Sequence, residues 1–140
     1  MLRDMFDNLG ERKSEKLEKE FGEYLMPGER VKAGFKMVRD AVLFTDKRLI
    51  FLDVQGLTGI KVSVESIFLS GIVSVTAETA GFGLDESALI LTYFLSPYHR
   101  AHEPKLAVKR LEFGKKINIQ ALYIMLEELA YENYQRINDR

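Results

Sequence analysis

Cysteine is absent from the 140-residue sequence. Its absence excludes disulfide bonds, thiolate nucleophiles and cysteine-ligated zinc sites, and it fits a reducing cytoplasm, where we expect the protein to reside. The sequence also lacks an apolar run of the roughly 18–20 residues that a membrane-spanning helix needs. We see no basic segment followed by an apolar stretch at its start, so we expect no secretory signal.

A large charge of one sign is absent as well. The 20 basic residues almost balance the 21 acidic ones, which leaves a formal net charge of −1 at pH 7. Proteins that bind nucleic acids draw much of their affinity from neutralising phosphates, and adhesion to anionic membranes depends on basic clusters in a similar way. We therefore expect no nucleic-acid partner. A membrane contact stays open, but the charge balance does not point to one.

Catalytic motifs are also missing. The sequence has no glycine-rich phosphate loop ending in Lys-Ser/Thr, no G-x-S-x-G and no H-E-x-x-H. His99 and His102, followed by Glu103, invite a metal interpretation, but zinc takes four ligands and this segment lies between two prolines. We interpret the two histidines as a surface pair. The sequence thus predicts a protein that is not an enzyme and that holds neither a metal nor a cofactor.

What the sequence does have is the composition of a globular domain, with 46% hydrophobic and 29% charged residues. Residues 1–27 place apolar side chains at helical spacing, with Ser14 as a candidate N-cap and Pro27-Gly28 as a stop signal. We predict that this N-terminal helical segment packs on its own domain or on a neighbouring subunit. A helix on the membrane surface is the weaker alternative, because the polar face mixes acids with lysines.

From residue 28 the hydrophobic period changes to two, and we predict a second region over residues 28–140. Apolar residues alternate in seven segments separated by turn signals, at 31–38, 41–45, 48–53, 62–64, 73–77, 89–93 and 105–113. The first links, at Arg39-Asp40 and Asp46-Lys47, are too short for crossovers, so these neighbouring strands must be antiparallel. This pattern is typical of a β-sandwich or a small barrel.

The last predicted strand changes phase along its length. Leu106 and Val108 alternate together, whereas Leu111 and Phe113 follow in the opposite phase. One extra residue would restore a single apolar face, so we predict a β-bulge near Lys109-Arg110.

A helix is predicted over residues 118–137, where the hydrophobic period returns to 3.6 and Asn118 can serve as N-cap. Its predicted core stripe comprises Ile119, Leu122, Leu126, Leu129 and Ala130. Ile124 and Tyr131 project away from that stripe, and exposed apolar groups often mark contact sites. Together with Leu2 and Phe6 of the N-terminal segment they are our candidates for an oligomer interface. A side pocket filled by the chain's own strand or N-terminal helix is the alternative.

Two segments give the chain a family resemblance. They are Thr45-Asp46-Lys47-Arg48-Leu49-Ile50 and Gln55-Gly56-Leu57-Thr58-Gly59. With the order of strands and helix, they resemble the bacterial pleckstrin-homology (PH) domain family of small stand-alone proteins, over roughly residues 28–126. The resemblance implies a mostly β fold, a seven-stranded antiparallel, partly open barrel or orthogonal sandwich capped by a C-terminal helix, with an extra N-terminal helix. Similar proteins assemble into symmetric homo-oligomeric rings.

PH domains that bind phosphoinositides hold the phosphates with basic residues near the first hairpin. The matching basic group here is Lys36, Arg39, Lys47 and Arg48. These cations could meet one phosphate group, although Asp40 subtracts charge and hairpin tips of this kind usually face water.

The function predicted from these features is a PH-like interaction or scaffold module that assembles with itself into a cyclic ring. The alternative is a domain that binds anionic lipid or phosphate at the membrane surface. The sequence leaves open a further protein partner and names no ligand.

Overall fold

The computed structural model describes residues 14–36, 40–55, 61–81, 86–114 and 117–139. Three of the predicted site residues, Leu2, Phe6 and Arg39, lie outside these ranges, as does the turn at residues 56–60. The contacts divide the chain into two compact units, Met1–Ile67 and Phe68–Arg140. Each unit is described by itself below.

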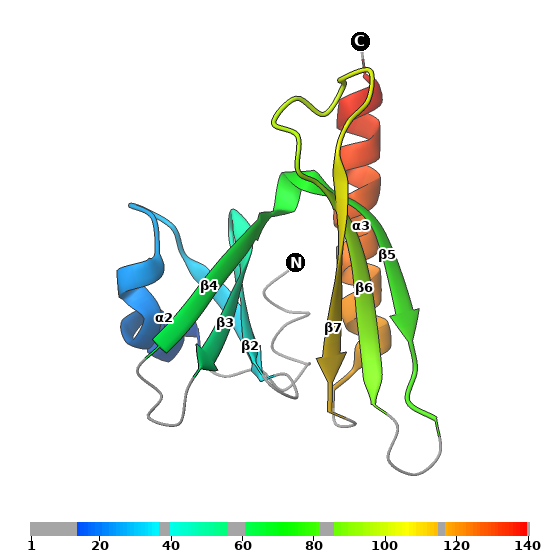
Figure 1. The fold of residues 1–140 in the computed structure, drawn as a ribbon. Coiled ribbons are helices and arrows are strands. Elements are labelled where there is room, and N and C mark those ends of the chain that lie inside the picture. The colour runs from blue at the N-terminus through cyan, green and yellow to red at the C-terminus, as the bar shows by residue number, and fades with distance from the viewer. Residues whose placement is uncertain (1–13, 37–39, 56–60, 82–85, 115–116, 140) are drawn as a thin grey trace. The chain divides into compact units, whose positions relative to one another are not determined.

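The first unit is a short helical segment followed by an antiparallel sheet (Figure 1). Its elements are helix α2 (Ser14–Phe21), the 3-10 turn η1 (Gly22–Tyr24) and strands β1 (Val31–Lys36), β2 (Ala41–Thr45), β3 (Arg48–Gln55) and β4 (Lys61–Phe68), whose last residue belongs to the second unit. The sheet order is β1-β2-β3-β4, as expected when short links force each strand to pair with the next. The predicted first three strands are therefore confirmed almost residue for residue.

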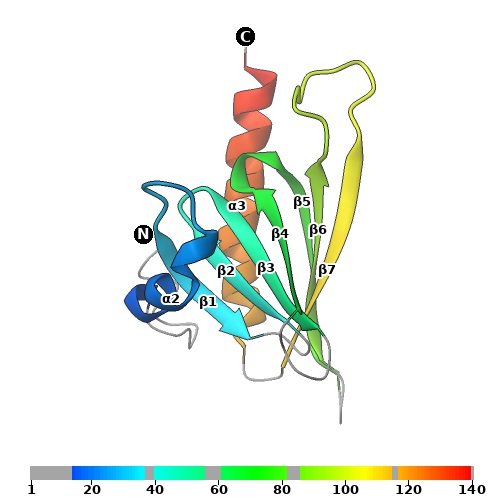
Figure 2. The ribbon, with the colours of Figure 1, turned by 60° about the vertical axis from the view of Figure 1, so that its left-hand side comes forward.

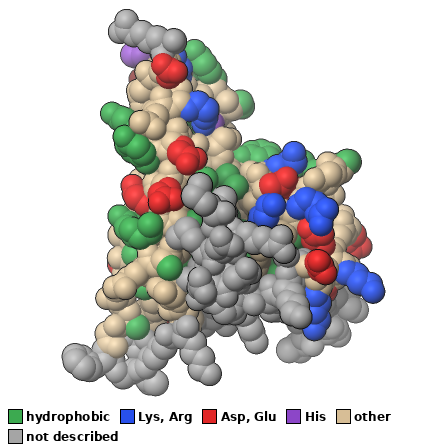
Figure 3. All heavy atoms as spheres, turned by 180° about the vertical axis from the view of Figure 1, so that it is seen from behind, with side chains coloured by type: hydrophobic (Ala, Val, Ile, Leu, Met, Phe, Trp, Pro, Cys, Tyr) green, Lys and Arg blue, Asp and Glu red, His purple; other side chains and the backbone are tan. Residues whose placement is uncertain are grey.

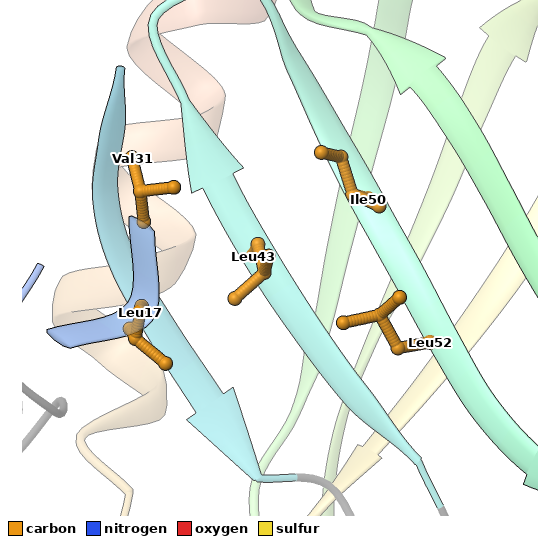
Figure 4. Packing of buried hydrophobic residues seen from close by; sticks show 5 residues of the cluster. All are labelled: Leu17, Val31, Leu43, Ile50 and Leu52. Carbon is orange, nitrogen blue, oxygen red and sulfur yellow. The ribbon is translucent and has the colours of Figure 1, made fainter. Parts of the chain in front are cut away.

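The core of this unit forms where α2 lies on the sheet. Leu17 of α2 packs with Val31, Leu43, Ile50 and Leu52, and all five side chains are buried (Figure 4). Gly34 of β1 makes this close approach easier, because a Cβ atom there would lie 2.5 Å from Cδ1 of Leu17. The described part of the N-terminal segment thus packs against the sheet of its own chain.

The second unit is a three-stranded antiparallel sheet with a long helix along it (Figures 1 and 2). Its elements are η2 (Leu69–Gly71), β5 (Ile72–Glu78), β6 (Ser87–Phe94), β7 (Leu106–Phe113) and α3 (Ile119–Asn138). The sheet order is β5-β6-β7, and α3 packs mainly against β5. The predicted seven strands and the C-terminal helix are all present in the two units.

Helix α3 begins as the sequence indicated. The Asn118 side chain accepts a hydrogen bond from the Ala121 amide at 3.1 Å, which satisfies one of the free donors of the first turn. Four of the five predicted stripe residues are buried, but Leu129 is only half-buried and Met125 takes its place. The stripe ends at Asn133, a buried polar residue.

The bulge predicted near Lys109-Arg110 is wrong. Strand β7 pairs with β6 in unbroken register, from Ser87 opposite Phe113 to Phe94 opposite Leu106. Because the alternation of faces is never reset, Leu111 and Phe113 are buried whereas Leu106 and Val108 are 47% and 65% exposed. An irregularity lies instead in β5, between Ile72 and Ser74.

In the described part of the chain, no helix is long and apolar enough to cross a membrane.

Candidate interaction surfaces

The hairpin between β2 and β3 carries a buried ion pair that the sequence did not reveal. Nε of Arg48 lies 2.9 Å from Oε2 of Glu29, and Nη2 of Arg48 donates to Oε1 of Glu29 at 2.9 Å. The Glu29 side chain is fully buried and that of Arg48 is 12% exposed. This fork-to-fork geometry is the strong form of an arginine–carboxylate pair.

Two further donors complete the surroundings of the Glu29 carboxylate. Thr45 donates its hydroxyl to Oε2 at 2.6 Å, and the Met26 amide donates to Oε1 at 2.9 Å. Burial by itself would raise the pKa of Glu29, but the hydrogen bonds from Arg48, Thr45 and Met26 lower that pKa to about 2. Glu29 is therefore ionised at neutral pH and holds the hairpin to the turn at residues 26–29.

The same guanidinium also contacts the helical segment. Nη2 of Arg48 donates to the Tyr24 carbonyl at 2.6 Å, so one side chain links the hairpin to η1. Thr45 Oγ1 accepts from the amides of Lys47 and Arg48 at 3.1 and 3.0 Å, which closes the tight turn. Asp46 accepts from the Arg30 amide at 3.0 Å. In the Thr-Asp-Lys-Arg segment, the side chains of Thr45, Asp46 and Arg48 thus have structural partners.

This arrangement bears on the predicted anion-binding group. Arg48 is engaged with Glu29 and Tyr24, whereas Lys47 is exposed at the hairpin tip. The side chains of Lys36 and Arg39 lie outside the described residues. A carboxylate already neutralises Arg48, so this cation has little charge left to offer a phosphate.

The low pKa of Glu29 predicts a dependence of stability on pH. In the unfolded chain this carboxyl has an ordinary pKa of 4.5, against about 2 in the folded chain. The stabilisation is present above pH 4.5, is lost as the pH falls toward 2, and amounts to about 3 kcal/mol. We expect the stability difference between the wild type and Glu29→Gln, measured by urea unfolding, to shrink between pH 5 and pH 2. A difference that stays constant over that range would contradict the low pKa.

The outward face of α3 is the second feature. Ile124 is 48% exposed and Tyr131 is 59% exposed, and the neighbouring Glu128 and Glu132 are exposed acids. Figure 3 shows hydrophobic and acidic side chains side by side along this helix. Both predicted interface residues of α3 thus lie on its solvent-facing side, in a stripe that alternates apolar and acidic groups. Such a stripe suits a partner surface that is apolar with basic residues beside it.

The C-terminal turns of α3 are held in place by polar contacts that the sequence pattern did not predict. Nδ2 of Asn133 donates to the carbonyls of Leu69 and Ile72 at 2.8 and 2.9 Å, and Arg136 donates to the Ser70 carbonyl at 2.8 Å. These bonds attach η2 to the last turns of the helix. Helical spacing could have predicted the burial of Asn133, because it continues the buried stripe from Leu126 and Ala130 to position 133.

The two histidines lie in the connection between β6 and β7. The His99 ring stacks on Phe94 with centroids 4.3 Å apart and an interplanar angle of 10°, whereas His102 is exposed. In the ranges that the structure describes, no three His, Asp or Glu residues are grouped so that they could hold a metal ion. His99 is thus occupied by an aromatic contact.

Comparisons with known proteins identify one family and one curated relative. The model of the family described as "Bacterial PH domain" matches residues 1–130. The uncharacterized protein YjqA of Bacillus subtilis (strain 168) is 47% identical over 75 residues, which are 53% of this chain and 60% of YjqA. The chain thus matches somewhat under two thirds of that relative's length.

Solved structures show the same fold. A pleckstrin-homology domain from Shewanella amazonensis SB2B is similar with a TM-score of 0.60 and 33% identity, covering 85% of this chain and 99% of that domain. A DUF1696 family protein with such a domain, from Shewanella loihica PV-4, has a TM-score of 0.62 and 27% identity, covering 86% of this chain and 95% of that protein. The predicted PH-like fold class is therefore confirmed.

Proposed function

The chain belongs to the bacterial PH domain family, and on that premise we propose that it is a scaffold module that assembles with copies of itself. The fold supports a binding or scaffold module, and PH domains are in general not catalytic. The observation that carries self-assembly is the exposed apolar and acidic stripe of α3, centred on Ile124 and Tyr131. The absence of cysteine supports a cytoplasmic setting.

We propose that the matching surface of the second copy is its N-terminal segment. Helix α2 exposes Lys16 and Lys19 next to the exposed Glu15 and Glu20, and the apolar Leu2 and Phe6 precede it in the sequence, outside the described residues. On this proposal the two lysines pair with Glu128 and Glu132 on α3 of the neighbouring copy, and the apolar residues of the segment contact Ile124 and Tyr131. A contact between two different surfaces of successive copies is heterologous, and it produces a closed ring when the rotation between copies closes. This is the basis on which we propose a cyclic homo-oligomer.

The test replaces the apolar part of the stripe. In the double variant Ile124→Glu with Tyr131→Glu, like charges accumulate beside Glu128 and Glu132 at positions that are exposed, so the fold should be retained. We expect the native mass, measured by sedimentation velocity, to fall at least twofold. Leu106→Glu is the matched control, because Leu106 is 47% exposed on β7 of the same unit. An unchanged mass in the double variant, with or without an effect of Leu106→Glu, contradicts the proposal.

A further inference from the structure

Strand β4 has an exposed outer edge. It is an outermost strand of the first sheet, and within the described ranges no strand pairs with its outer side. Every residue from Lys61 to Ser66 is exposed, so both faces of this stretch meet solvent as well. The free amide and carbonyl groups of such an edge are a template for another strand.

The sequence of β4 is complementary to itself in one register. In an antiparallel pair related by a two-fold axis, residues that lie opposite each other share a face of the joined sheet. With the axis at Ser63, Lys61 of each copy lies opposite Glu65 of the other, and Val62 lies opposite Val64. Opposite charges and β-branched pairs at such positions stabilise sheets.

Neighbouring registers lose this match. An axis at Val64 sets Glu65 opposite Ser63 and Lys61 opposite Ile67, whereas an axis at Glu65 sets two glutamates against each other. The β4 strand therefore selects one register by its own charges.

The other outermost strands of the two sheets are less complementary to a second copy of themselves. Strands β1 and β5 each carry charges of one sign only. On β7 an axis at Leu111 would set Arg110 opposite Glu112, but it would also set Lys109 opposite Phe113, and both Leu111 and Phe113 are buried within their own unit.

We propose that the β4 strands of two copies pair antiparallel about a two-fold axis at Ser63 and join two four-stranded sheets into one. Glu65 also interacts within its own chain. The proposed pairing requires only that the negative charge of Glu65 lies opposite Lys61 of the other copy, so this intrachain interaction is compatible with it. The inference rests on the proposed self-association but uses a different surface from α3. Five residues a side is small beside the ~20–30 of a typical stable interface, so the β4 contact adds to the α3 contact.

A single introduced thiol tests the axis directly, because the chain has no cysteine of its own. Residues directly opposite in a sheet have Cβ atoms about 4.5–5.5 Å apart, close to the ~3.5–4.5 Å of a disulfide. We expect mild oxidation of the Ser63→Cys variant of the whole chain to give a covalent dimer of two 16.1 kDa chains on a non-reducing gel. Ser66→Cys is the matched control, since two such positions lie roughly 20 Å apart in this register.

A charge exchange tests the register. Lys61→Glu and Glu65→Lys, each combined with Ser63→Cys, place like charges opposite each other twice, and each should slow cross-linking several-fold. Mixing the two variants should restore the rate, because a mixed pair has opposite charges at both positions. Lys32→Glu on β1 should leave cross-linking unchanged.

The outcomes separate the two proposals. Equal cross-linking of Ser63→Cys and Ser66→Cys, or no gain on mixing, overturns the β4 contact. Loss of cross-linking in a chain that remains oligomeric overturns the β4 contact alone. Cross-linking that survives while Ile124→Glu with Tyr131→Glu leaves the native mass unchanged supports the β4 contact and overturns the α3 contact.

Discussion

Glu29→Gln is expected to lower the free energy of unfolding by about 3–5 kcal/mol. The substitution leaves the Arg48 guanidinium, which is 12% exposed, without the carboxylate that neutralises it. Removing one partner of a buried pair costs far more than the pair itself contributes, because the remaining charge stays desolvated. Chemical unfolding at pH 7 measures the difference.

A surface ion pair of the same unit provides the control. Arg30 contacts Glu18 at 2.9 Å, but its side chain is 66% exposed. Arg30→Met should therefore cost less than about 1 kcal/mol. Replacing both buried partners, with Glu29→Met and Arg48→Met together, should recover part of the loss seen in Glu29→Gln. Equal costs for Glu29→Gln and Arg30→Met would show that the buried pair does not hold the hairpin.

Leu17→Ala is expected to cost about 2–5 kcal/mol, because it removes a fully buried side chain at the centre of the first unit's core. Leu17 is the buried residue of α2 in that core, so the cavity would open between the helix and the sheet. Thermal or urea unfolding of the full chain measures the effect.

Met26→Ala is the matched control for this change. Met26 is also an apolar residue of the first unit, but it is 36% exposed and lies outside β4, so its truncation should cost less than about 1 kcal/mol. If Leu17→Ala cost no more than Met26→Ala, the helix would not be packed on its own sheet, and the N-terminal segment would have to find its partner elsewhere.

The sequence predicted the parts of the fold that local patterns determine. Strands separated by two-residue links at Asp46-Lys47 can pair in one way only, and the Asn118 cap marks the start of α3 without reference to the rest of the chain. The placement of Ile124 and Tyr131 on the outer side of α3 followed from helical geometry alone.

The sequence predictions failed where a residue's position depends on a partner that is distant in the sequence. A phase change in β7 suggested a bulge, but pairing with β6 keeps the register and leaves Leu106 and Val108 exposed. Asn133 is polar, so the hydrophobic pattern did not predict its burial. Its side chain can be buried because it donates hydrogen bonds to the carbonyls of Leu69 and Ile72.

Arg48 is the most instructive of these cases. In the sequence it stands beside Lys47 and suggests a phosphate-binding site, but its counterion, Glu29, lies 19 residues away, where no local pattern links the two. The family motif at residues 45–48 therefore encodes a hairpin held by a buried pair. The two contacts that we propose therefore use other surfaces, those of α3 and β4.

The native mass of the unmodified chain tests the central claim most directly. Light scattering at micromolar concentration and neutral pH should give a mass several times the 16.1 kDa of one chain. A mass of 16.1 kDa under those conditions would contradict self-assembly, and the exposed stripe of α3 would then need a different partner.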